Sequence, residues 1–214
     1  MMDIIIPVLN EEKILRERAA YYYLLKEKAR VIFVDGGSRD KTVDVAQCYG
    51  CVVSSLPGRS IQKNYGIRES TSGRLLFLNV DSCVDIPVLD KMEQLLGNGV
   101  VCGCLTMKIE DTRMIFRFFE WLVNFRAKMF SVFDADLGLF IRRNVFESIG
   151  GFDPLPVMDD VAFSKKIRCV TSLYVLPDVV TVSSRKWQER GFLKTLWSYT
   201  RAYLHFWTRF AFLS

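Results

Sequence analysis

The feature that most constrains the fold is a short apolar run at residues 75–78 that ends in polar residues. The run reads Leu-Leu-Phe-Leu, follows Ser72 and Gly73, and leads into Asn79 and Asp81. A continuous apolar run between turn residues is typical of a strand buried on both faces of a parallel sheet. Ligands bind at the carboxyl ends of such strands in open α/β sheets. The sequence therefore predicts Asp81 at the mouth of the sheet, where its carboxylate can hold a metal ion and a phosphate. A turn or cap carboxylate is the open alternative.

Strands and helices alternate along the first part of the chain. Strands are expected at residues 4–8, 31–34, 51–53 and 75–78, with helices between them, the first over 11–29. This alternation predicts an α/β fold with a mostly parallel central sheet flanked by helices. Further on we expect a helix over 114–130, a strand over 137–141, a strand pair within 173–182 interrupted by Pro177, and a final aromatic helix over 192–213. No linker is evident, so we expect a single domain over 1–214.

Charge and composition narrow the choice of partners and compartment. The 214 residues carry a net charge of +5, a mild excess that fits an acidic small ligand such as a nucleotide diphosphate, or anionic lipid. It is not the charge of a nucleic-acid-binding chain, and no nucleic-acid partner is expected. No signal peptide or membrane-spanning run is visible. We expect a cytoplasmic protein, with contact to a membrane surface left open.

Polar residues follow several of the predicted strands. Asn10 and Glu11 follow the first strand, Asp35 ends the second, and Asp81 follows the fourth. Because neighbouring parallel strands end at the same edge of a sheet, we expect these residues to meet on one rim. Two further groups come later in the chain, the adjacent acids Asp159-Asp160 and the segment Ser184-Arg185-Lys186-Trp187.

Taken together and in order, these motifs resemble those of one enzyme family. The matching segments are Pro7-Val8-Leu9-Asn10-Glu11, Asp35-Gly36-Gly37-Ser38, Pro57-Gly58-Arg59, Asn79-Val80-Asp81, residues 136–143, Gly150-Gly151-Phe152-Asp153 and Met158-Asp159-Asp160-Val161. They resemble the inverting nucleotide-sugar transferases of glycosyltransferase family two, which have the GT-A fold. The resemblance covers nearly the whole chain and is strongest to an arsenosugar-biosynthesis subgroup.

The resemblance implies a nucleotide-binding half over 1–86, an acceptor half over 87–190 and a C-terminal helix over 191–214. Pro7, Asn10 and Glu11 would line the base pocket, and Asp35 would accept hydrogen bonds from the nucleoside. Arg59 would lie against the base or its phosphates, although a lone arginine is often only a surface residue. The donor is expected to be a nucleotide-diphosphate sugar, with UDP as the nucleotide.

The resemblance also implies the groups that act on the diphosphate and the acceptor. Asp81 would ligate Mg²⁺ or Mn²⁺ at the Asp-x-Asp position, where Asn79 replaces the usual first acid. Asp160, next to Asp159 at a predicted helix start, would be the general base that inverting transfer needs. Arg185 and Trp187 would contact the diphosphate and cover the sugar. A helix start with a cap and a first-turn acid, and a basic loop capping the last helix, are the alternatives for these groups.

Two questions stay open at this stage. The aromatic segments over 114–130 and 192–212 could pack in the core, form a contact between two copies, or lie on a membrane. The chain could also be a nucleotidyltransferase, or an inactive nucleotide-binding or membrane-surface module. A nucleotidyltransferase usually carries a glycine-rich basic loop after its first strand, and here that position reads Pro-Val-Leu-Asn-Glu.

Overall fold

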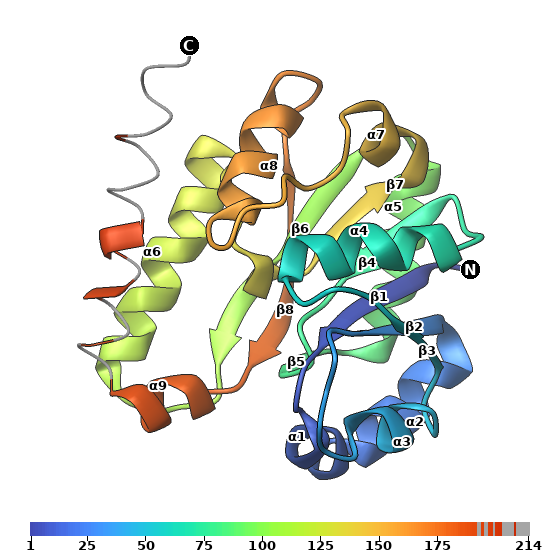
Figure 1. The fold of residues 1–214 in the computed structure, drawn as a ribbon. Coiled ribbons are helices and arrows are strands. Elements are labelled where there is room, and N and C mark those ends of the chain that lie inside the picture. The colour runs from blue at the N-terminus through green and yellow to red at the C-terminus, as the bar shows by residue number, and fades with distance from the viewer. Residues whose placement is uncertain (192–193, 195–196, 199, 203–207, 209–214) are drawn as a thin grey trace.

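A computed structural model describes residues 1–191, 194, 197–198, 200–202 and 208 (Figure 1). Its strands are β1 (Asp3–Val8), β2 (Arg30–Asp35), β3 (Cys51–Ser54), β4 (Arg74–Phe77), β5 (Ser82–Val84), β6 (Cys102–Ile109), β7 (Leu139–Arg142) and β8 (Tyr174–Val182). Its helices are α1 (Glu12–Glu17), α2 (Ala19–Lys28), α3 (Thr42–Ala46), α4 (Arg59–Glu69), α5 (Ile86–Gly97), α6 (Met114–Phe130), α7 (Arg143–Ser148), α8 (Asp159–Arg168) and α9 (Arg185–Arg190), with a 3-10 turn at Ala135–Leu137.

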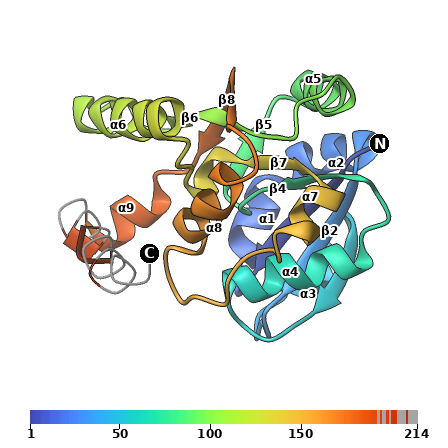
Figure 2. The same ribbon diagram turned by 90° about the horizontal axis from the view of Figure 1, so that it is seen from above.

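The strands form one sheet in the order β3-β2-β1-β4-β7-β6-β8-β5. The pairings of β1 with β2, β1 with β4, β2 with β3 and β6 with β8 are parallel. Those of β4 with β7, β6 with β7 and β5 with β8 are antiparallel. Helix α4 packs over β1 and β2 on one face of the sheet, while α2 and α5 lie together on the other (Figures 1 and 2). The predicted α/β fold is confirmed, with a sheet of mixed direction.

Helix α4 approaches the sheet closely because it carries Gly66 at the contact. A Cβ atom at Gly66 would lie 2.6 Å from Ile5 Cγ2 and 2.8 Å from Val34 Cγ2. Real Cβ atoms do not come this close to other atoms, so the packing requires glycine. The close approach sets the depth at which the start of α4 meets the carboxyl ends of β1 and β2.

Two expected elements differ from the structure. The helix predicted over 11–29 breaks at Arg18, which separates α1 from α2. Its guanidinium donates to Cys83 Sγ and, at 2.7 Å, to Glu110 Oε2, both far away in the sequence. The strand pair predicted around Pro177 is a single strand, β8. The register against β6 shifts between Cys104 and Thr106, and such an irregularity accommodates a proline that cannot donate a ladder hydrogen bond.

Helix α6 forms where the sequence predicts it, whereas most of the helix predicted over 192–213 lies outside the described residues. None of the helices in the described part of the chain is long and apolar enough to cross a membrane.

Candidate functional site

The first part of the site is a pair of loops at the carboxyl ends of β1 and β2. Val8 lies in register with Asp35, so both strands end at the same edge. Asp35 is buried, and its carboxylate accepts the N–H groups of Gly37 at 3.0 Å and Ser38 at 3.1 Å. Asn10 has a positive φ of 54° and bridges the loops, because its N–H donates to Ser38 Oγ at 2.9 Å. These contacts hold both loops in one conformation.

A buried glutamine that the sequence analysis missed supports these loops from below. Gln62 on α4 donates its amide hydrogens to the carbonyl oxygens of Val8 at 2.9 Å and Val34 at 2.7 Å. A Cβ atom at Gly36 would lie 3.1 Å from Gln62 Nε2, so glycine leaves room for this clamp. No sequence pattern distinguishes Gln62 from a surface residue, because its role depends on the close packing of α4.

The other rim residues differ in their surroundings. Pro7 pairs with Val34 within the sheet and is half-buried, and Arg59 opens α4 with an exposed side chain. Glu11 Oε2 accepts a hydrogen bond from Arg185 at 2.7 Å, which joins the end of β1 to the start of α9 across 174 residues.

Trp187 is only 8% exposed and packs edge-on against Phe116 and Phe119 of α6. These contacts surround its ring with apolar side chains, whereas Arg185 faces the rim.

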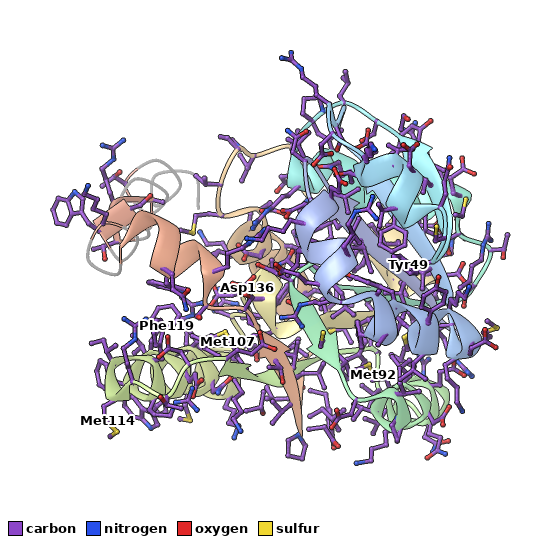
Figure 3. The ribbon with its side chains drawn as sticks, turned by 90° about the horizontal axis from the view of Figure 1, so that it is seen from below. Tyr49, Met92, Met107, Met114, Phe119 and Asp136 are labelled. Atoms are coloured by element: carbon purple, nitrogen blue, oxygen red, sulfur yellow. The ribbon has the colours of Figure 1, made fainter. Side chains whose placement is uncertain are left out.

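Asn79 and Asp81 lie in the turn between β4 and β5, and both are buried. The Asn79 amide donates to the carboxylate of Asp136, 57 residues further on. Asp136 lies near the centre of the molecule (Figure 3). Although the sequence analysis quoted the segment that contains Asp136, it did not single this residue out. Asp136 therefore supplies a carboxylate next to the neutral side chain of Asn79.

Asp160 and Asp159 open α8 as expected, and their side chains have separate partners. Asp160 is half-buried and accepts the N–H groups of Ala135 at 2.7 Å and Val161 at 2.8 Å. Asp159 pairs with the buried Lys63 of α4 at 3.1 Å. Lys63, which the sequence analysis missed, therefore ties α4 to the start of α8.

Electrostatics couple these acids to each other. Burial, followed by the nearby carboxylates of Asp134 and Asp159, raises the pKa of Asp160 to about 7, while Lys63 acts in the opposite direction. Burial also raises the pKa of Asp134, Arg126 lowers it, and Asp136 raises it again. The interactions run without a gap from Asn79 through Asp136 and Asp134 to Asp160. The turn after β4 and the start of α8 therefore belong to one connected polar cluster.

Asn79, Asp81 and Asp136 carry side-chain oxygen atoms, the ligand type that Mg²⁺ and Mn²⁺ prefer. Among the described residues, no three histidine, cysteine or acidic side chains converge as a metal site would require. A metal ion here would need further oxygen ligands, which a bound diphosphate can supply. The oxygen donors therefore suit Mg²⁺ or Mn²⁺ only together with ligands from outside the protein.

A family model and several solved structures match the chain. The family model described as Glycosyl transferase family 2 matches residues 3–149. No sequence among the curated proteins matches the chain.

Among solved structures, TarS 1–349 from S. aureus superposes with a TM-score of 0.64 at 16% identity, covering 86% of this chain and 60% of that one. The same TarS fragment in complex with UDP-GlcNAc gives a TM-score of 0.65 at 16% identity, covering 85% and 58%. The mannosyltransferase PcManGT from Pyrobaculum calidifontis, solved in complex with GDP-Man and Mn²⁺, gives 0.64 at 18% identity, covering 84% and 56%. The chain thus spans less than two thirds of the length of these neighbours, and the likeness confirms the predicted GT-A fold.

Proposed function

Because the chain belongs to glycosyl transferase family 2, we propose that it transfers a sugar from a nucleotide-diphosphate donor, a UDP-sugar, to a hydroxyl group of an acceptor, with inversion at the sugar. The observation that carries this proposal is the cluster that joins Asn79 and Asp136 to Asp160, a carboxyl group with a pKa raised to about 7. Such a cluster provides a polar end for the leaving diphosphate and a base for the acceptor. The resemblance to the arsenosugar subgroup stays a prediction.

The donor would bind over the two loops at the ends of β1 and β2. In this proposal Pro7, Asn10 and Glu11 line the base pocket, Asp35 accepts from the nucleoside, and Arg59 lies against the base or phosphates. Asp35 already accepts two backbone N–H groups, and its two oxygens still have lone pairs for a ligand donor. The fixed loops support this role because a rigid acceptor loses little entropy on binding.

The diphosphate would lie between Asp81 and the start of α9. Asp81, beside Asn79, would hold Mg²⁺ or Mn²⁺, which would supply positive charge against the leaving nucleotide diphosphate. Arg185 contributes a cation, which Glu11 orients at 2.7 Å. The burial of Trp187 against α6 supports a role in fixing α9, and so Arg185, more than a role as a cover over the sugar. Asp159, paired with Lys63, would hold the start of α8 in position beside the donor.

Asp160 would take the proton of the acceptor hydroxyl, and this role makes the rate depend on pH. A general base acts only when ionised, and with a pKa of about 7 the carboxyl is increasingly protonated below neutral pH. We expect kcat/KM to fall about tenfold per pH unit below pH 7 and to level off above it. Initial rates from pH 5 to pH 9 would measure this, and a profile that stays flat down to pH 5 contradicts the assignment.

A thermal-shift panel tests the proposed function as a whole. We expect a UDP-sugar or UDP with Mn²⁺ to raise the melting temperature by roughly 5–10 °C at about 100 times Kd. Mn²⁺ alone should give almost no shift, because Asn79 beside Asp81 is a neutral amide and gives the metal one negative charge fewer than the usual acid at that position. The variant Asn79→Asp is the matched control and should respond to Mn²⁺ without nucleotide. Stabilisation by triphosphates in preference to diphosphates would favour a nucleotidyltransferase, and no shift with any nucleotide would favour an inactive module.

A further inference from the structure

Helix α6 presents an apolar surface to solvent. Its residues, which we call the α6 outer face, are Met114, Ile115, Phe118, Trp121, Leu122, Phe125 and Met129. They are between 40% exposed, for Phe125, and 80% exposed, for Met114. The spacing of three and four residues places them on one side of the helix. Trp121 stacks between Phe118, at 5.9 Å between ring centroids, and Phe125, at 5.4 Å. Contiguous exposed apolar surface of this kind marks an interaction site.

The opposite side of α6 contacts the sheet, so the residues of the α6 outer face are not the ones that pack against the core. The side chain of Asn124 donates to Met107 O at 3.0 Å and accepts from Met107 N at 2.8 Å. Glu120 accepts the N–H of Ile109, and Arg117 donates to the carbonyl oxygen of the same residue at 2.8 Å. In Figure 3 Phe119 lies on the side of α6 toward α9, and Met114 lies at the outer end of the helix. Helix α6 contacts β6 and projects beyond it at the edge of the fold (Figure 2).

The charges on α6 decide which partner suits this face. Its single carboxylate, Glu120, is buried and pairs with Arg117 at 2.6 Å. At about 100° per residue, Lys128 and Arg117 border the outer face on one side and Arg126 on the other. Arg126 pairs with Asp134, whereas Lys128 is exposed. A second copy on this face would bring like charges together with no exposed carboxylate of α6 to pair them. An apolar face bordered by basic side chains, with Lys128 exposed, instead matches anionic lipid, where apolar side chains enter the acyl boundary and Lys or Arg meet the headgroups.

We propose that the α6 outer face binds the surface of an anionic lipid bilayer, with the helix lying in the interface. Three of the residues described beyond Gly191 are also of these types, since Trp197 is 68% exposed and Lys194 and Arg201 are exposed as well. The helix has 17 residues and lies on the bilayer without crossing it. This inference does not depend on the proposed transfer reaction.

Vesicle co-sedimentation of the full chain tests the inference. The protein should sediment with vesicles of phosphatidylglycerol and phosphatidylcholine, and much less with phosphatidylcholine alone. The double variant Phe118→Ser/Trp121→Ser should lower the partition coefficient by about tenfold or more, because two large apolar side chains no longer enter the lipid. Lys128→Glu should weaken binding to anionic vesicles specifically.

The matched control is the double variant Leu24→Ser/Leu56→Ser, which removes two exposed apolar side chains from outside α6 and should bind like the wild type. The inference is overturned if the wild type fails to bind anionic vesicles, or if the α6 variant binds as well as the control. Light scattering measures the oligomeric state and so tests the alternative that a second copy of the chain binds this face. A dimer that the α6 variant dissociates, without vesicle binding, would assign the face to a second copy.

Discussion

Replacing Asp160 by asparagine is expected to lower kcat by about 10²- to 10⁴-fold, the range that a general base contributes. An amide cannot take the proton from the acceptor hydroxyl, while its oxygen can still accept one of the two N–H groups that Asp160 binds, those of Ala135 and Val161. The nucleotide is expected to bind elsewhere, on the loops after β1 and β2. Affinity for UDP with Mn²⁺ should therefore stay close to that of the wild type.

Steady-state kinetics and calorimetric titration with UDP and Mn²⁺ would measure the two effects separately. The matched control is Asp178→Asn, which removes a half-buried carboxylate whose partner is Lys91 and which lies outside the polar cluster. The control should retain turnover. If Asp160→Asn also retains turnover, Asp160 is not the base, and if it loses nucleotide affinity as well, its role is structural.

Replacing Lys63 by methionine is expected to have the second large effect, on stability and on pH dependence. Lys63 and Asp159 form a buried ion pair at 3.1 Å, with side chains 3% and 10% exposed. Removing one partner of a buried pair leaves an uncompensated charge and typically costs about 3–5 kcal/mol. Lys63 also lowers the pKa of Asp160. Without Lys63 this pKa should rise, and the acidic limb of the rate profile should move to higher pH.

Urea unfolding and the pH–rate profile would test both parts. The control Lys91→Met breaks an ion pair with Asp178 at 2.6 Å in which Lys91 is 56% exposed. Exposed pairs contribute about 0–1 kcal/mol, so this variant should unfold nearly like the wild type, with an unshifted profile. Equal stabilities for the two variants would contradict the importance of the buried pair.

Local patterns were sufficient to predict most of the fold. The apolar runs of β1, β2 and β4 predict buried strands, and the helix α6 follows from its own sequence. The predictions were wrong where a distant contact changes the local conformation. The predicted helix breaks at Arg18, whose side chain binds the distant Cys83 and Glu110. Pro177 stays within one strand, beside a shift in the register against β6.

The sequence by itself determined which polar groups follow which strands, since strand ends and helix starts are local properties of the chain. Asp35 and Asp81 could be chosen on that basis, whereas Asp160 was chosen through the resemblance to a known family. Only the tertiary structure decided what surrounds them: Gln62 beneath the strand ends, Asp136 against Asn79, and Lys63 against Asp159. These contacts join residues 28 to 96 positions apart. Burial and charge act through space, so the raised pKa of Asp160 depends on packing that no local pattern contains.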